Sequence, residues 1–366
     1  MIELDKLSKA YGGTTAIEDV SLTIEDDEYL TVLGPSGSGK STLLRVIAGL
    51  ERADTGRVRL NGEDITHRPP HRRHLGFVQQ NYALFPHMSV SQNVAFGLKH
   101  REEAPVTDEA EVTRRVGAML KLVGLSDLGD RMTGQISGGQ KQRVSLARTL
   151  VTEPRFCLLD EPLGALDANL RERMTVELRK IRETLGVTFV HVTGNEAEAL
   201  AMGDRMVVLD TGRVAMIEAP DRVYETPATV NVARSLNAYN VLPGAVADGV
   251  FVTGGARLPL PHAASGAAHY AIRFDLASIA REGEAPAQDG KLATRFITAE
   301  FMGSKVIYFL RREDGAVVEV ERHLSRADPV AYQKDEPLTV HFAPSDALLY
   351  DGSGRLIEAP RLEGAA

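Results

Sequence analysis

The sequence predicts an α/β domain with a mainly parallel sheet, followed by a small all-β barrel domain of the OB type. The first observation is a strand-like run at residues 29–33, a Gly/Ser-rich loop at Gly34–Thr42 and a helix-like run at 43–48. The second is that strand-like and helix-like segments alternate through residues 1–236. The third is that residues 237–366 contain only short β-like runs, separated by Gly, Pro and Asp. We therefore expect two domains with these bounds.

The loop Gly34–Thr42 fits the phosphate-binding pattern G-x-x-x-x-G-K-S/T. Between a strand and a helix, such a loop lets backbone N–H groups close around a polyphosphate, and the helix start adds partial positive charge. We expect Lys40 to reach the terminal phosphates and the hydroxyl of Ser41 to bind Mg²⁺. The alternative is a chance match in a Gly/Ser-rich turn, which the flanking strand and helix disfavour. The predicted nucleotide-binding residues of the loop are Gly34, Pro35, Ser36, Gly37, Ser38, Gly39, Lys40, Ser41 and Thr42.

Composition narrows the classes of function. The chain has 366 residues and a formal net charge of −8, which argues against a general nucleic-acid binder. Mean hydropathy is −0.14, and no run approaches the ~20 apolar residues of a membrane span. The single cysteine, Cys157, lies in an apolar run and excludes an internal disulfide, which suits a reducing cytosol. The first residues include acids and no apolar segment, so we expect no signal peptide and a membrane role only through a partner.

Residues 2–33 contain short alternating apolar runs that predict a small sheet leading into the strand before the phosphate loop. Tyr11 precedes the turn signal Gly12-Gly13, which would leave its ring exposed beside a nucleotide. An aromatic ring there can stack on a base. The alternative is an ordinary surface tyrosine.

A strand-like run at 75–78 leads to Gln79-Gln80 and then to the stretch Asn81–His87, which contains an aromatic pair and Pro86. Exposed apolar residues in such a loop are candidates for contact with a partner. The alternative is a loop that folds onto its own domain.

We expect a helical subdomain over about residues 88–155. Thr107 or Asp108 is predicted to cap a helix that ends at Gly124. A further helix is predicted to begin at Ser137-Gly138-Gly139-Gln140, where the glycines would expose backbone N–H groups as a second anion site. The basic residues of that helix are typical of a solvated helix face: Lys141, Arg143 and Arg148.

The apolar run Phe156–Leu159 ends in two acids, Asp160 and Glu161. In a phosphate-loop protein an acid at such a strand end supports Mg²⁺, and the adjacent acid orients or deprotonates the attacking water. The alternative is a solvated turn, which the upstream phosphate loop disfavours. Asp167 is then predicted to cap a long amphipathic helix whose apolar stripe belongs to the core.

With these motifs in order, the chain resembles the ATP-binding subunit of an ABC transporter over nearly its full length. The resemblance implies a P-loop NTPase cassette with a helical subdomain, a TOBE-type barrel, and ATP and Mg²⁺ as ligands. Ile136, where leucine is usual, and Gly164, where serine is common, depart from the family pattern. The resemblance implies that Tyr11 stacks on adenine and that Gly34–Thr42 is the Walker A loop. It implies Mg²⁺ contact for Ser41, Asp160 and Gln80, partner sensing for Gln80, and catalysis for Glu161. It also implies that Gly164–Asp167 is the D-loop and that the signature motif, which acts in trans, consists of Ser137, Gly138, Gly139 and Gln140.

The variety resembles importer ATPases for carbohydrates and related solutes. The loop Tyr82–His87, the stretch Asn240–Gly244 and the barrel-like tail, which resembles a regulatory domain, match that variety. The stretch Ile272–Asp275 departs from its Arg-Pro-Glu pattern. The resemblance favours sugars, polyols such as glycerol, and glycerol phosphates as solutes over polyamines, iron or sulfate.

The larger departure lies at Gly194. In the family the strand after the long helix ends in Thr-His-Asp, and that switch histidine reaches the γ-phosphate, whereas this chain has Thr193-Gly194-Asn195. His191 lies three residues earlier, and strand alternation points it to the opposite face of the sheet. We therefore expect His191 to be a packed or half-exposed strand residue that does not replace the switch histidine.

The resemblance implies two ATPase subunits that meet head to tail, two integral membrane permease subunits and a solute-binding protein, with this chain peripheral at the cytoplasmic face of the inner membrane. In a first hypothesis, Glu161 supports hydrolysis at its own site. In a second, which we favour, the chain is the weaker half of an unequal pair, and Ser137–Gln140 completes the partner's site. A third hypothesis is a soluble ABC-type ATPase acting on DNA or ribosomes, which the single cassette and acidic charge disfavour.

Overall fold

The computed structural model describes residues 1–366 with the exception of 103, 165, 167, 282, 325–328 and 358–366. The predictions that fall on Ala165 and Asp167 of the D-loop lie outside the described residues, as does the end of the predicted C-terminal domain. The chain forms two compact units, Met1–Val223 and Tyr224–Ala366, which are described separately. Among the described residues, no helix is long and apolar enough to cross a membrane.

The two units divide earlier than the boundary predicted at residue 236. The segment around α8 (Val230–Ser235) is bonded to the second unit, since the Tyr350 hydroxyl donates to the Pro227 carbonyl at 3.0 Å. The Val230 N–H donates to the Gly354 carbonyl at 2.9 Å. Sequence periodicity does not reveal such bonds, because their partners lie far apart along the chain.

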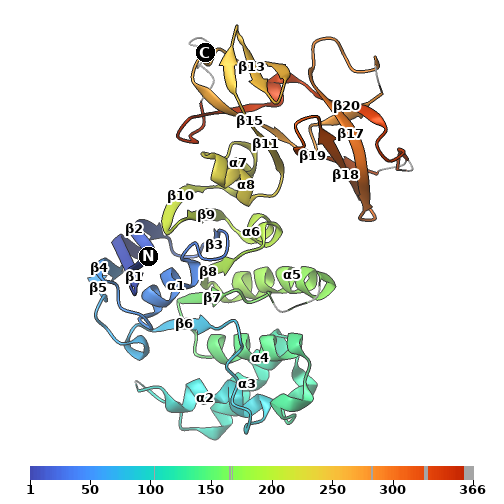
Figure 1. Ribbon diagram of the computed structural model, residues 1–366. Coiled ribbons are helices and arrows are strands. Elements are labelled where there is room, and N and C mark those ends of the chain that lie inside the picture. Colours follow the sequence, from blue (N-terminus) through green and yellow to red (C-terminus); the bar gives the residue numbers. More distant parts are fainter. Residues whose placement is uncertain (103, 165, 167, 282, 325–328, 358–366) are drawn as a thin grey trace, which may run out of the picture. The chain divides into compact units, whose positions relative to one another are not determined.

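The first unit is built on a six-stranded sheet in the order β10-β9-β3-β8-β7-β6 (Figure 1). Its strands are β3 (Tyr29–Leu33), β6 (Leu75–Val78), β7 (Phe156–Asp160), β8 (Thr188–Thr193), β9 (Arg205–Asp210) and β10 (Arg213–Glu218). Every neighbouring pair is parallel except β9 and β10, which confirms the predicted α/β class. All residues of β3, β7 and β8 are buried, as expected of parallel strands covered on both faces.

A second, antiparallel sheet is formed by two strands that come before β3 in the chain and two that come after it. Its order is β2-β1-β4-β5, with β1 (Ile2–Tyr11), β2 (Thr14–Ile24), β4 (Thr55–Leu60) and β5 (Glu63–Asp64). The small sheet predicted before the phosphate loop is therefore confirmed. Gly12 and Gly13, both with positive φ, form the turn between β1 and β2.

The central strands divide their side chains between two hydrophobic cores. Leu30 and Val190 pack in one core with α1 (Lys40–Ala48) and the antiparallel sheet. Tyr29 and Phe189 belong to the other core, which includes the helical section and α5 (Ala168–Leu185). Cys157 lies in this second core and is fully buried, and burial raises the pKa of its thiol.

The helical section contains α2 (Val90–His100), α3 (Glu109–Leu122) and α4 (Gly138–Leu150), with the 3₁₀ turns η2 (Ser126–Leu128) and η3 (Thr133–Gln135). Figure 1 shows the three helices grouped together beyond β6. Of the two predicted caps, Thr107 and Asp108, it is the Asp108 side chain that caps α3, by accepting from Ala110 N–H. The predicted cap of α4 is also confirmed, because Ser137 Oγ accepts from Gln140 N–H while the Gln140 side chain accepts from Ser137 N–H.

The C-terminal end of α1 is held by a buried arginine, Arg73, which follows the 3₁₀ turn η1 (Pro70–Arg72) and is 3% exposed. Its guanidinium donates to four backbone carbonyls, those of Val46 and Ile47 in α1 and of Thr66 and Arg68. Burial lowers the pKa of Arg73. The side chain therefore satisfies carbonyls that the helix end would leave without partners.

Replacing Arg73 with methionine should lower the free energy of unfolding by roughly 3 kcal/mol or more, because each buried acceptor left unsatisfied costs about 1–3 kcal/mol. Urea unfolding of the full chain measures the change. The matched control is Arg72→Met, at an exposed neighbour whose guanidinium lies 3.6 Å from Glu102. An equal loss in the two variants would contradict the assignment.

The second unit is rich in β-strands, consistent with the predicted C-terminal β domain, although it also contains α8. In its described part the strands form three antiparallel sheets around one core. The first sheet contains β11 (Tyr239–Pro243), β15 (Ala267–Arg273) and β21 (Leu348–Asp351), and the second β12 (Ala245–Ala247), β13 (Val250–Thr253) and β14 (Ala256–Pro259). The third has the order β16-β20-β17-β18-β19, with β16 (Ser278–Ala280), β17 (Gly290–Phe301), β18 (Lys305–Arg312), β19 (Val317–His323) and β20 (Pro337–Phe342). The remaining elements among the described residues are α6 (Glu196–Met202), α7 (Pro220–Glu225) and the 3₁₀ turn η4 (Pro344–Asp346).

Candidate functional site

The phosphate loop connects the end of β3 to the start of α1, as predicted. Its first and last glycines are required by close contacts with other strands. A Cβ at Gly34 would lie 2.4 Å from the Leu209 carbonyl oxygen, and one at Gly39 would lie 2.2 Å from that of Ala16. Gly37 and Gly39 also have φ of 81° and 94°, which favour glycine. The loop is thus fixed in shape by the strands on both sides.

Lys40 is the first residue of α1 and is only 6% exposed. Its Nζ donates to the carbonyls of Gly34 at 2.7 Å and Pro35 at 3.0 Å, so the amine is bound to the first two residues of the phosphate loop. Burial lowers the pKa of Lys40, opposed in part by the carboxylates of Glu161 and Asp160. Carbonyls are weak partners for a buried ammonium, and an anionic phosphate would be a stronger one.

Two oxygen ligands suited to a divalent cation meet beside the loop. Asp160 ends β7 and is 4% exposed, and its Oδ1 accepts from Ser41 Oγ at 2.7 Å. A hydroxyl and a carboxylate are the kind of oxygen donors that Mg²⁺ binds together with water and substrate phosphates. The pair therefore fits the predicted Mg²⁺ contact.

The next residue, Glu161, is positioned by the backbone and by Gln80. Its N–H donates to the Val192 carbonyl at 2.9 Å, and its φ of 45° is left-handed, an uncommon conformation for a non-glycine residue. Gln80 Nε2 donates to Glu161 Oε2 at 2.8 Å. The predicted catalytic acid and the predicted Mg²⁺-sensing glutamine are thus in direct contact.

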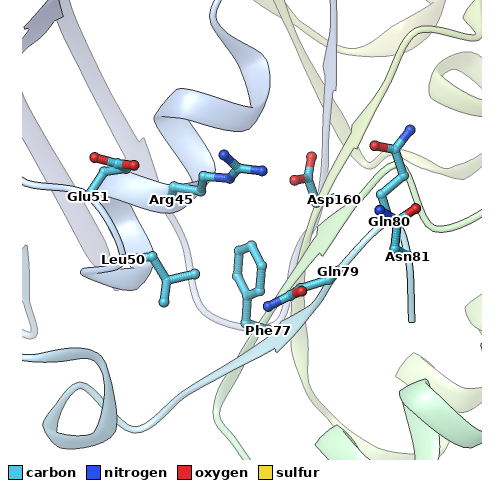
Figure 2. A pocket seen from close by; sticks show the side chains of 8 residues that line it. All are labelled: Arg45, Leu50, Glu51, Phe77, Gln79, Gln80, Asn81 and Asp160. Carbon is cyan, nitrogen blue, oxygen red and sulfur yellow. The ribbon is translucent and has the colours of Figure 1, made fainter. Parts of the chain in front are cut away.

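A cavity of about 280 Å³ opens beside Asp160. Figure 2 shows Arg45 of α1 and Asp160 facing each other across it, with Gln80 on the other side of Asp160. The residues that line it are Arg45, Leu50, Glu51, Phe77, Gln79, Gln80, Asn81 and Asp160. Sequence reasoning missed Arg45, which lies one helical turn after Ser41 and therefore on the same face of α1.

The end of β8 lies beside the phosphate loop without offering a side chain. Thr193 pairs with Leu33 in the parallel register of β3 and β8, so Gly194 and Gly34 follow at the same edge of the sheet. A Cβ added at Gly194 would meet nothing within 4 Å. The position therefore has room for a side chain and carries none.

His191 does not fill this position. It is fully buried in β8, with Nδ1 2.9 Å from the Tyr29 hydroxyl and Nε2 3.6 Å from a Glu198 carboxylate oxygen. Because alternate strand residues face opposite sides, His191 lies on the face away from Gly194. It is a packed strand residue, as expected from the sequence.

The remaining predicted residues lie outside this cluster. Ser137, Gly138, Gly139 and Gln140 form the start of α4, and within the described part of the chain no hydrogen bond or ion pair joins them to the phosphate loop. A Cβ at Gly138 would meet nothing within 4 Å, whereas one at Gly139 would lie 2.4 Å from Leu170. Tyr11 ends β1 and is 44% exposed, with Lys9 Nζ 5.4 Å from its ring centroid.

The expectation that the basic residues of α4 form a solvated face is wrong for Arg148. Its guanidinium donates to the carbonyls of Tyr82 at 2.9 Å and Ala83 at 2.7 Å, and Ser145 Oγ donates to the same Tyr82 carbonyl. Burial lowers the pKa of Arg148. The partners lie more than 60 residues earlier in the chain, so helical periodicity gave no signal for them.

Comparisons with known proteins agree with this arrangement. The ABC transporter family model matches residues 17–164, and the TOBE domain model matches residues 271–349. The sulfate/thiosulfate import ATP-binding protein CysA of Methylococcus capsulatus is 43% identical over 326 residues, which cover 89% of this chain and 92% of that protein. The chain belongs to the ABC transporter family as the ATP-binding subunit of an importer.

Other relatives of this importer ATPase cover shorter stretches. The spermidine/putrescine import ATP-binding protein PotA of Thermobifida fusca is 50% identical over 247 residues, covering 66% of this chain and 63% of that protein. A solved dimeric ATP-binding cassette in a post-hydrolysis state, bound to ADP and Pi, is similar with a TM-score of 0.55 and 32% identity, covering 60% of this chain and 99% of that one. These matches confirm the predicted cassette and TOBE domain, and an ATP hydrolase coupled to transport.

The relatives do not support the predicted carbohydrate or polyol type. Those named import sulfate/thiosulfate or spermidine/putrescine, which the resemblance had ranked lower. The prediction rested on the resemblance of loop and tail motifs to those of one variety of importer ATPase. The relatives are also import proteins, which argues against the alternative of a soluble ATPase acting on DNA or ribosomes.

Proposed function

We propose that this chain binds ATP at an interface with a second ATPase subunit, and that its own site hydrolyses ATP slowly while its α4 motif completes the partner's faster site. The observation that carries this proposal is Gly194, which leaves the end of β8 beside the phosphate loop without a side chain. Removing one preorganised donor from a site of developing charge costs about 10²–10³ in rate. The other groups for ATP binding are present.

The chain's own residues divide the work at this site. Backbone N–H groups of Gly34–Thr42 and the Lys40 amine bind the phosphates, and exposed Tyr11 stacks on the adenine. Ser41 and Asp160 hold Mg²⁺, with Gln80 nearby. When bound, Mg²⁺ offsets the negative charge that develops on the phosphates during transfer. Glu161 orients the attacking water, and Gln80 holds its carboxylate in place.

The start of α4 acts on the partner's ATP rather than on the chain's own. Its first N–H groups carry the partial positive charge of a helix N-terminus, and Ser137 and Gln140 fix the turn that presents them. In the partner's site this positive end faces the γ-phosphate, so closure on ATP draws the two chains together. We propose that this partner is a related, non-identical chain that has its own switch histidine. The partner's site could then hydrolyse ATP.

Sulfate or thiosulfate is the proposed solute, with polyamines as the second candidate. The support is that the sulfate/thiosulfate relative aligns with 89% of this chain, including most of its second unit. The permease and the solute-binding protein select the solute, so uptake of labelled sulfate and labelled spermidine by vesicles carrying the complete importer separates the two. Uptake of neither would contradict the assignment.

The isolated chain tests the proposed function of its own site. We expect it to bind ATP in a manner that Lys40→Met abolishes, and to turn over ATP well below the roughly 1–10³ s⁻¹ of typical enzymes. Binding is measured by equilibrium titration and turnover by phosphate release from the same preparation. Brisk turnover that Glu161→Gln abolishes would contradict the proposal.

The loop Gln80–His87 passes the state of the ATP site to the membrane subunits. Arg148 holds it by bonds to the carbonyls of Tyr82 and Ala83, whose φ values of 60° and 47° are both left-handed. Such a conformation costs about 1–2 kcal/mol per non-glycine residue and persists where contacts over-determine it. The contact joins the loop to α4, whose other end carries the trans motif.

Arg148→Met should therefore reduce solute transport by the complete importer at least tenfold while leaving the ATP dissociation constant of the isolated chain within about twofold, since a bond worth 1.5–3 kcal/mol is lost far from the phosphate loop. The matched control is Arg114→Met, an exposed arginine paired with Glu111 on α3. Unchanged transport in the Arg148 variant, or an equal fall in the control, would show that the loop does not depend on this contact.

A further inference from the structure

A buried carboxylate, Glu198 of α6, lies behind the end of β8 and is 4% exposed. Its Oε2 accepts a hydrogen bond from the Thr193 hydroxyl at 2.7 Å. Its Oε1 lies 3.1 Å from Nε of Arg171 on α5. One side chain thus joins the last residue of β8 to a helix that follows the end of β7.

The contacts of Glu198 continue in both directions. On the β8 side, Thr193 Oγ1 accepts from Asn195 N–H at 3.0 Å, and Asn195 Oδ1 accepts from Glu198 N–H at 2.9 Å. Both neighbours of Gly194 are therefore tied to Glu198. On the β7 side, an Arg171 guanidinium N–H donates to the Leu166 carbonyl at 3.0 Å. The Leu166 N–H donates to the Leu163 carbonyl at 3.1 Å, and Gly164 N–H donates to the Glu161 carbonyl at 3.2 Å.

The environment keeps this carboxylate charged and in one orientation. Burial alone would raise the pKa of Glu198, but His191, the Thr193 hydroxyl and the charge of Arg171 outweigh it and leave the pKa below its usual value. His191 Nε2 faces Oε2 at 3.6 Å, while its Nδ1 is held by the Tyr29 hydroxyl. Buried charges persist only when paired and hydrogen-bonded in this way. Removing the charge would loosen every group it holds.

We propose that Glu198 is a positioning residue that holds the segment Thr193–Asn195 in place against the ATP site and couples it, through Arg171, to Leu166. The inference rests on the proposed function, because that segment is the place from which a switch side chain would reach ATP. A γ-phosphate sensor is effective only if its backbone is fixed. In this chain the backbone is fixed although the sensor is missing, so a histidine introduced at Gly194 works only with Glu198 intact.

Amide hydrogen exchange on the full-length chain with bound ATP tests the coupling without relying on hydrolysis. Glu198→Gln should speed exchange at Asn195 and at Leu166 at least tenfold, with the ATP dissociation constant unchanged within twofold. The matched control is Glu196→Gln, which removes the same charge from the same turn of α6 and should change neither amide. Faster exchange at Asn195 alone would mean that Glu198 acts only on its neighbours in the chain, which would overturn the coupling. No change at either amide would also overturn it.

Thr193→Val provides a second variant in case Glu198→Gln does not fold. It keeps the shape of the side chain and removes only the hydroxyl that joins Asn195 to Glu198, so the same increase is expected at Asn195 and a smaller one at Leu166. Unchanged exchange at Asn195 in this variant would overturn the proposal.

Turnover gives an independent readout. If Gly194→His raises turnover, the kcat of the double variant Gly194→His/Glu198→Gln should be at least tenfold lower than that of Gly194→His. The KM of the two variants should be the same. A double variant as fast as Gly194→His would overturn the positioning role while leaving the proposed function intact. No gain from Gly194→His itself would contradict the proposed function, and the exchange measurements would still decide the role of Glu198.

Discussion

Gly194→His should raise the ATP turnover of the isolated chain roughly tenfold or more, because one positioned donor at a developing charge is worth about 10²–10³ in rate. The substitution restores an imidazole at the edge of the sheet where β8 ends level with β3. A Cβ at Gly194 meets nothing within 4 Å, and its backbone has no left-handed φ, so the new side chain enters without strain.

The matched control is Gly194→Phe, which fills the same space with a ring that cannot donate a hydrogen bond. We expect the phenylalanine variant to bind ATP and to remain as slow as the natural chain. Phosphate release by the three proteins at saturating ATP measures the effect. Equal rates for the histidine variant and the natural chain, in protein shown to fold and to bind ATP, would mean that Gly194 does not limit turnover.

Gly138→Asp should lower the ATP turnover of the complete importer by about 100-fold, the scale of one lost electrostatic contact in a catalytic site. The substitution places a carboxylate in the first turn of α4, where an acid is locally favourable to the helix. In the partner's site, however, the same carboxylate repels the γ-phosphate. A Cβ at Gly138 meets nothing within 4 Å, so the chain itself has room for it.

Gly138→Asn is the control for this prediction, since asparagine has the same shape as aspartate and no charge. We expect the asparagine variant to retain most of the turnover and both variants to unfold at the same urea concentration. If asparagine and aspartate lowered turnover equally, the effect would be steric and the electrostatic role of the α4 start would be wrong.

Sequence patterns predicted the features that depend on neighbouring residues. The phosphate loop, the cap of α3 at Asp108 and the capping box of Ser137 with Gln140 are all local, because a helix start or a tight turn is specified within a few residues. Strand alternation also predicted that His191 would be packed in β8. Gly194 stood out only because the resemblance supplied a pattern from which it departs.

The features that sequence patterns missed depend on residues far apart in the chain. Arg73 bonds to carbonyls of α1, Arg148 to those of Tyr82 and Ala83, and Glu198 to Arg171. In each case a charged residue at an ordinary helical or turn position becomes partly or fully buried only when the chain folds, and composition alone predicts such a residue to be solvated. The carbohydrate or polyol solute was predicted from loop and tail motifs alone, and the sulfate/thiosulfate and spermidine/putrescine relatives do not support it.

The most direct test of the central claim is the ATP turnover of the complete importer carrying Glu161→Gln in this chain. If this chain is the weaker half of an unequal pair, turnover should fall by less than about twofold, because the partner's site does nearly all the hydrolysis. If Glu161 instead supported most of the hydrolysis, the loss of this acid–base group would lower the rate by about 10²–10⁴. A loss of that larger size would contradict the account and assign hydrolysis to Glu161 itself.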